Sequence, residues 1–223
     1  VYNTFCILLY LQFLPSIPPL AKPQKAAKNN YRKRLETAQG SPGLNGCPIG
    51  EYVMEKIRNY EELTSHGDIE SRKVVLEIAE KTLLRLDSRR RIKSIMHMDG
   101  PILHIGTKSW DLSKKRHVYL LGAGKACNHM AMAVDEILGD YLTKGIIIVK
   151  IAEDTDVFRH TDVYVGGHPL PNEEGYKACL KILELVDAAG PDDLFICVIS
   201  GGSSALMSCP LPGISLQDEI DTT

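Results

Sequence analysis

The feature that most constrains this chain is a regular alternation of two kinds of apolar segment between residues 118 and 199. Short apolar runs of strand length alternate with segments whose apolar residues repeat every three or four positions, as on one face of a helix. Such alternation through short turns favours an α/β domain with a mainly parallel sheet covered by helices. The expected strands are residues 118–121, 145–149, 162–165 and 194–199, and the last is apolar throughout, as strands covered on both faces are.

Three helices are expected from spacing and from their ends. One covers residues 127–138 and closes at Gly139, and one follows Asn172, which can cap a first turn containing Glu173 and Glu174. The third begins after Asp68 and continues to about residue 83. The expected buried stripes are Ile69, Val75, Ile78, Ala79 and Leu83 in the helix after Asp68, and Tyr176, Cys179, Leu180, Leu183 and Val186 in the helix after Asn172.

Composition excludes several classes of protein. A hydrophobic fraction of 44% with 24% charged residues is typical of a globular chain. The net charge of -2 gives no overall attraction to nucleic acid or membrane, so neither partner is expected. The six cysteines include no CxxC pair, which argues against a zinc ribbon. Cys127, Cys179 and Cys197 lie in apolar periodic segments and are expected as buried free thiols in the reducing cytoplasm.

The first 60 residues have a different character. An apolar run over residues 5–14 is too short to span a membrane, and the basic residues between Lys22 and Arg34 follow it, which is the wrong order for a secretory signal. Pro-rich and polar composition continues to about residue 50. We predict that residues 1–60 are a disordered or non-native extension with few contacts to the domain, and that residues 61–223 form the domain. The chain has no initiator Met and ends without a stop signal, so we expect it to be a fragment.

Glycine-rich loops follow three of the expected strands, at the sheet edge where α/β proteins bind ligands. The first contains Gly122, Gly124 and Lys125. Its glycines allow close backbone approach, the helix start offers free N–H groups to an anion, and Lys125 adds a positive charge. The loop matches neither a Walker A motif nor a dinucleotide fingerprint. A tight turn with a surface lysine therefore stays open as an alternative.

The second loop follows the most apolar strand and consists of small residues, which leave backbone N–H groups able to form an anion-binding nest, with hydroxyls as further donors. A nucleophile elbow is excluded because GxSxG is absent. A flexible linker is the alternative. The residues predicted to bind phosphate or substrate in this loop are Ser200, Gly201, Gly202, Ser203 and Ser204.

The third loop, residues 166–172, has two prolines that stiffen it and carries His168. His168 is a candidate to contact a ligand or to act as an acid or base. Because a single histidine is more often structural, that alternative stays open. The other six histidines have no motif support.

These three loops, in this order and spacing, resemble the class II glycerate 2-kinase family, also called the MOFRL family. The resemblance covers about residues 67–223, and residues 1–60 match nothing in it. The matching stretches are residues 118–126 (VYLLGAGKA), 167–171 (GHPLP), 199–206 (ISGGSSAL) and 213–216 (GISL).

The resemblance implies a transferase that phosphorylates D-glycerate to 2-phosphoglycerate with ATP and a divalent metal, usually Mg²⁺. The implied fold is a Rossmann-like, three-layer, mainly parallel amino-terminal domain, incomplete here, with the active site in a cleft facing a smaller carboxy-terminal domain. By the same resemblance Lys125 is a catalytic-site residue and residues 200–204 cradle phosphate or substrate. The metal ligands are not identified.

Two departures from the family pattern stand out. Ser203 replaces a third glycine, so a Cβ lies where a phosphate would approach, although its hydroxyl can donate instead. The family also continues past Thr223 into the carboxy-terminal domain, which is expected as a missing partner, so we expect this chain to be inactive alone. A homodimer is a further possibility.

Two other functions are weighed. A hydroxypyruvate reductase is compatible with a strand–GxG–helix unit, but the second strand is followed by Lys150 where a ribose-binding acid is usual. A non-catalytic truncated gene product would explain the unusual ends of the chain.

Overall fold

The computed structural model describes Phe5–Tyr10 as backbone and residues 54–223 with their side chains. The chain divides into two compact units. One contains the strand Phe5–Tyr10 together with residues 84–223, and the other contains residues 54–83 of the described chain.

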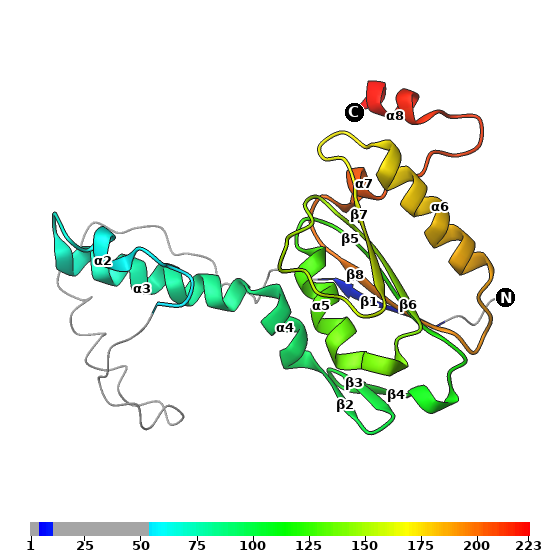
Figure 1. The fold of residues 1–223 in the computed structure, drawn as a ribbon, viewed down its shortest axis with the longest axis horizontal. Helices are drawn as coiled ribbons and strands as arrows, with labels where there is room; N and C mark the ends of the chain where they lie inside the picture. Colours follow the sequence, from blue (N-terminus) through cyan, green and yellow to red (C-terminus); the bar gives the residue numbers. More distant parts are fainter. Residues whose placement is uncertain (1–4, 11–53) are drawn as a thin grey trace, which may run out of the picture. The chain divides into compact units, whose positions relative to one another are not determined.

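The first unit is built on a five-stranded sheet in the order β1-β8-β5-β6-β7, and every neighbouring pair is parallel (Figure 1). Read from the other side, the sheet order is β7-β6-β5-β8-β1. If β5, β6, β7 and β8 are numbered 1 to 4 along the chain, the first four strands have the order 3-2-1-4, as in the doubly wound dinucleotide-binding sheets. The prediction of an α/β fold with a mainly parallel sheet is confirmed, and the strands that precede the first two glycine loops are hydrogen-bonded neighbours. The strands are β1 (Phe5–Tyr10), β5 (Val118–Ala123), β6 (Lys144–Val149), β7 (Thr161–Val165) and β8 (Leu194–Ile199).

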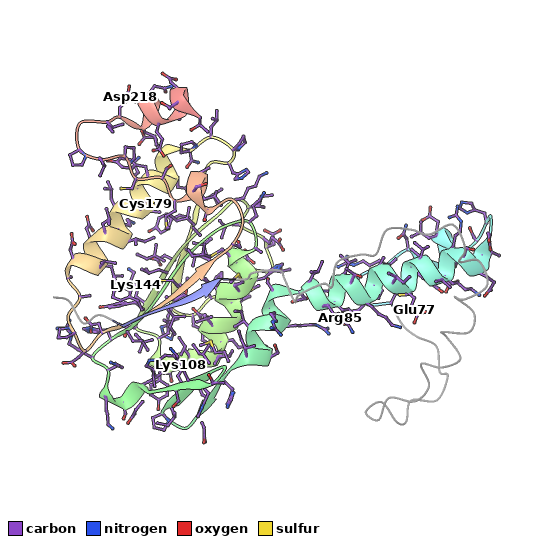
Figure 2. The ribbon with its side chains drawn as sticks, turned by 180° about the vertical axis from the view of Figure 1, so that it is seen from behind. Glu77, Arg85, Lys108, Lys144, Cys179 and Asp218 are labelled. Atoms are coloured by element: carbon purple, nitrogen blue, oxygen red, sulfur yellow. The ribbon has the colours of Figure 1, made fainter. Side chains whose placement is uncertain are left out.

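One long helix covers each face of this sheet. The helix α5 (Cys127–Leu138) packs on one face and α6 (Glu173–Asp187) on the other (Figure 1). Alternate strand residues point to the two sides, as pleating requires: Leu120 and Ile147 join the α5 core, whereas Leu121 and Ile146 join the α6 core. Cys179, labelled in Figure 2, lies in the α6 core.

The α5 side also carries elements that the sequence did not predict. They are the helix α4 (Ser88–Ile95) and an antiparallel sheet of β2 (Met96–Asp99), β3 (Ile102–Ile105) and β4 (Lys108–Asp111). Ile92, Met96 and Leu103 are buried in the same core as α5. These strands have four residues each, which is too short to show a clear alternation of apolar residues in the sequence.

The buried face of α6 differs from the expected stripe. Cys179 is buried as predicted, but Leu180 and Leu183 are 39% and 46% exposed. The face toward the sheet instead consists of Gly175, Ala178, Cys179 and Ile182. At Gly175 the helix passes close to other backbone, because an added Cβ would lie 2.6 Å from the carbonyl oxygen of Leu206.

The strand β1 corrects part of the prediction for the first 60 residues. Phe5–Tyr10 pairs with Leu194–Ile199 along its whole length, so this apolar run belongs to the sheet. The expectation of few contacts with the domain is wrong for these residues. The basic residues from Lys22 to Arg34 lie outside the described residues, and the domain boundary at residues 60 and 61 stays a prediction.

The second unit contains α2 (Tyr60–Leu63) and most of α3 (Ile69–Leu86). Asp68 caps α3 as predicted, accepting a hydrogen bond from the Ser71 amide at 3.2 Å. The expected apolar stripe is not buried: Val75 and Ile78 are 62% and 61% exposed, and side chains project from α3 on all sides (Figure 2). The buried residue of α3 is Glu80, whose carboxylate accepts hydrogen bonds from the amides of residues 55–57.

Two short helices, α7 (Ser203–Leu206) and α8 (Leu216–Thr222), follow β8. Ser215 and Asp218 form a reciprocal capping box at the start of α8. Within residues 5–10 and 54–223, the helices are too short or too polar for any of them to cross a membrane.

Candidate functional site

The three glycine loops meet above Gly202. A Cβ built on this residue would lie 2.8 Å from Cδ2 of His168 and 3.2 Å from Cε of Lys125. The side chains from the first and third loops therefore both reach over the backbone of the second loop. Gly202 has φ +91°, a left-handed backbone conformation that residues other than glycine rarely adopt. The three loops therefore meet at one place.

The first and second loops are also bonded directly to each other. The Lys125 amide donates to the carbonyl of Gly201 at 2.9 Å, and the Ala126 amide donates to Oγ of Ser200 at 3.0 Å. Gly124, at φ +132°, lets the loops approach this closely, because an added Cβ would lie 2.1 Å from the same Ser200 oxygen. The adjacency follows from the strand order, since β5 and β8 end side by side.

These bonds change which groups are available to a ligand. The amides of Lys125 and Ala126 are already used between the loops, so the expectation of free N–H groups at this point of the first loop is wrong. Within residues 54–223, the amides of Gly201 and Gly202 have no protein acceptor. Gly201 and the Lys125 side chain are exposed, and Gly202 is partly buried, so these donors can reach a ligand. An anion suits this combination.

Gly122 and Ser200, both predicted to bind a ligand, have roles within the protein itself. Gly122 is buried at the end of β5, where an added Cβ would lie 2.6 Å from Sγ of Cys127 and from Cγ2 of Val198. Ser200 braces the first loop through its hydroxyl. Ser203 and Ser204 open α7, beside the other residues of the second loop, with Ser203 partly buried and Ser204 exposed. Their binding roles stay predictions.

The third loop is held by close packing beneath His168. The Gly166 amide donates to the carbonyl of Val149 at 2.9 Å, which ties the loop to β6. A Cβ added at Gly167 would lie 2.2 Å from the carbonyl oxygen of Leu170. The peptide bond between His168 and Pro169 is cis. These contacts hold the backbone of the loop in place. The side chain of His168 is partly buried, and its ring lies close to Gly202.

The electrostatics of the three loops favour negative ligands. Residues 122–126, 166–172 and 199–206 contain no Asp or Glu, whereas they contain Lys125. The thiol of Cys127, directly after the first loop, is not a reactive group. Burial raises its pKa far above the ordinary value, because the thiolate would be desolvated.

The opposite edge of the sheet carries a structural ion pair. Asp193 precedes β8 and is fully buried, and Arg116 precedes β5 and donates to both carboxylate oxygens, at 3.0 and 2.5 Å. These hydrogen bonds hold the pKa of Asp193 far below its usual range, although burial opposes the shift. His117 and the Gly190 amide also contact the carboxylate. This cluster joins the starts of two strands and is far from the glycine loops along both of them.

Sequence reasoning missed one group near the first loop. His129, in the first turns of α5, lies beside Glu153 and Asp156 from the segment after β6. No motif marked these residues, because they lie 24 to 27 positions apart in irregular spacing. The carboxyl end of β6, paired with β5, was the signal that could have suggested them.

The sequence that forms these loops matches a known protein family. Residues 74–223, more than half of the chain, match the family model described as "Domain of unknown function (DUF4147)". The chain belongs to the DUF4147 family. The match begins within α3 and includes all three glycine loops.

Named relatives of this DUF4147 chain include kinases. It is 31% identical over 147 residues to the D-glycerate 2-kinase of Thermotoga maritima, which covers 66% of this chain and 32% of that protein. It is 37% identical over 100 residues, 45% of this chain and 23% of the relative, to an Agrobacterium vitis protein called "Putative hydroxypyruvate reductase". The resemblance to glycerate 2-kinases is confirmed.

The fold agrees as well. A crystal structure of a glycerate kinase from Thermotoga maritima superposes with a TM-score of 0.53 at 32% identity, over 66% of this chain and 32% of that one. The chain therefore spans about a third of the length of the relatives that it matches.

Proposed function

We propose that this chain forms the phosphate-binding part of a glycerate 2-kinase, an enzyme that phosphorylates D-glycerate to 2-phosphoglycerate with ATP. The observation that carries the proposal is the convergence of Lys125 and His168 over the backbone of Gly202. The names of the relatives support the substrate and the reaction class. Because the chain covers a third of those relatives, the activity belongs to a protein that contains further residues.

Phosphoryl transfer needs positioned donors more than covalent chemistry from the protein. Lys125 would neutralise charge on the transferring phosphoryl group or hold the carboxylate of glycerate. The amides of Gly201 and Gly202 would hold phosphate oxygens, and the absence of a Cβ at residue 202 leaves room for His168 and Lys125 beside them. His168 would contact the phosphate or the substrate hydroxyl.

Magnesium fits this site only through the nucleotide. Mg²⁺ is bound by oxygen ligands, often phosphates, waters and one or two carboxylates. The three loops offer no carboxylate, so residues here would hold the phosphates that carry the ion. Bound Mg²⁺ would neutralise phosphate charge, and Lys125 would add to that neutralisation from the protein side.

A carboxy-terminal domain of the same protein would supply the second wall of the cleft. The reaction would take place in the cytoplasm. A homodimer is compatible with the partly exposed apolar residues of α6, Leu180 and Leu183.

A reductase is the second candidate, and it rests on two observations. The strand order 3-2-1-4 is that of dinucleotide-binding sheets, and one relative is named for hydroxypyruvate reduction. Against it, Lys150 follows β6 at the place where an acidic residue would bind the ribose of NAD. The kinase accounts better for an acid-free site with a converging lysine.

Titration of the chain with ATP and with NADH, by calorimetry, separates the two candidates. The kinase proposal predicts saturable binding of ATP that Lys125→Ala weakens, and no comparable binding of NADH. Tight NADH binding that Lys125→Ala leaves unchanged would favour the reductase.

Turnover tests the reaction itself. A chimera in which residues 84–223 replace the matching third of the Thermotoga maritima enzyme should convert D-glycerate and ATP to 2-phosphoglycerate, identified by phosphorus NMR. Lys125→Ala in this chimera should lose about 3 kcal/mol of transition-state stabilisation, roughly a hundredfold in rate. A chimera that is folded and binds ATP but forms no phosphoglycerate would contradict the proposed reaction.

A further inference from the structure

A histidine and two carboxylates converge beside the first glycine loop without forming part of it. His129 lies in α5, four residues beyond Lys125, and Glu153 and Asp156 come from the segment between β6 and β7. One nitrogen or oxygen atom from each side chain lies within 4.8 Å of the other two. Nε2 of His129 is 3.5 Å from Oε2 of Glu153.

The segment that carries the carboxylates is fastened to α5. Nδ2 of the buried Asn128 donates to both oxygens of Asp156, at 3.2 and 3.3 Å, and the Glu153 amide donates to Oδ2 of Asp156 at 2.9 Å. The Val157 amide also contacts Sδ of Met132 at 3.4 Å. Outer contacts of this kind fix the orientation of ligand side chains in metal sites.

The charge of the cluster points to a cation. Two carboxylates this close repel each other unless an opposite charge lies between them. Within residues 54–223, no lysine or arginine forms an ion pair with Glu153 or Asp156. The imidazole of His129 is the nitrogen group that lies beside both carboxylates. Lys150, which is exposed and precedes these residues in the chain, forms no salt bridge with either of them in the described part of the chain.

We propose that His129, Glu153 and Asp156 bind a divalent transition-metal ion such as Mn²⁺ or Zn²⁺. One imidazole nitrogen with two carboxylate oxygens suits these ions, whereas Mg²⁺ takes oxygen ligands almost exclusively. The three protein ligands leave positions for water. The ion would lock the segment after β6 onto α5, next to the loop that carries Lys125. This proposal does not depend on the kinase reaction.

Binding of Mn²⁺ to the 223-residue chain, followed by electron paramagnetic resonance, tests the proposal. The wild-type chain should bind one Mn²⁺ saturably, and Zn²⁺ should displace it while a similar concentration of Mg²⁺ does not. His129→Gln should weaken Mn²⁺ binding by about tenfold or more, since even outer-contact changes weaken metal sites by that factor. Glu153→Gln should do the same, and it remains informative if His129→Gln does not fold.

His160→Gln is the matched control, because His160 also faces a carboxylate, Asp140 at 4.0 Å, but only one. It should bind Mn²⁺ as the wild type does. The metal-free thermal midpoints of the variants should match that of the wild type, whereas Zn²⁺ should raise the midpoint only where His129 and Glu153 are both present. Absence of saturable binding, or equal binding by Glu153→Gln and the wild type, would overturn the proposal.

Discussion

The Lys125 amide donates a 2.9 Å hydrogen bond to the carbonyl of Gly201, so the loops after β5 and β8 are joined by their backbones. This bond fixes the place from which the Lys125 side chain departs. The Gly202 N–H points away from Lys125, because it shares a trans peptide unit with the carbonyl of Gly201 that this bond engages. The anion site proposed here is therefore set by the backbone and not by side-chain packing alone.

Gly202→Ala tests the convergence of the three loops. The new Cβ would lie 2.8 Å from His168 and 3.2 Å from Lys125, on a backbone with φ +91°. We expect ATP affinity of the chain to fall at least tenfold and the free energy of unfolding to fall by about 1–2 kcal/mol. Gly213→Ala is the control, because its backbone has nearly the same φ, +92°, but an added Cβ there meets no atom within 4 Å. Equal ATP affinity of the Gly202→Ala chain and the wild type would contradict the convergence.

Asp193→Asn tests the ion pair at the other edge of the sheet. A carboxyl whose pKa is lowered on folding stabilises the protein at pH values above its ordinary pKa of about 4, and that contribution is lost as the pH falls further. At pH 7 we expect Asp193→Asn to lower the free energy of unfolding by about 2 kcal/mol, a modest value because Arg116 is half exposed.

Urea unfolding at pH 7 and pH 3 measures this effect. The difference between Asp193→Asn and the wild type should shrink at pH 3, since the wild-type carboxyl then begins to lose its advantage. Asp192→Asn, at an exposed neighbouring position, should behave as the wild type at both pH values. A difference that stays constant from pH 7 to pH 3 would show that the charge of Asp193 is not the cause.

Removal of residues 1–11 tests whether β1 is part of the sheet. β1 pairs with the whole of β8, so its loss would leave an apolar strand with an open edge. We expect a lower thermal midpoint and concentration-dependent self-association, measured by calorimetry and light scattering. An unchanged midpoint with a monodisperse shortened chain would show that β8 does not need this neighbour.

The sequence predicted the parts of the fold whose signals are local. The strands before Gly122 and Ser200 are long and apolar, and Asn172 caps its helix through a 2.9 Å bond from the Gly175 amide, as expected. Burial was harder to predict. On α6 the small residues Gly175 and Ala178 are buried, whereas Leu180 and Leu183 are exposed. At Gly175 the cause is the backbone of Leu206, which is distant in the sequence.

In the candidate site, too, local features could be predicted from the sequence and contacts between distant residues could not. Its three loops could be found because glycines after strands mark close backbone approach. Which amides remain free could not be found, since that depends on the bond between Lys125 and Gly201, residues far apart in the sequence. The cluster of His129, Glu153 and Asp156 was missed for a similar reason, because only the pairing of β5 with β6 brings its two segments together.

Calorimetric titration of the chain with ATP, for Lys125→Ala beside the wild type, tests the central claim most directly. Lys150→Ala is the matched control, since Lys150 is an exposed lysine that follows the neighbouring strand β6. We expect Lys125→Ala to weaken ATP binding about tenfold or more, with an unchanged thermal midpoint, and Lys150→Ala to bind normally. Lys125→Arg should restore binding only in part, because the guanidinium is larger and planar. If Lys125→Ala and the wild type bind ATP equally well, Lys125 is a surface residue on a tight turn and the proposed phosphate site is wrong.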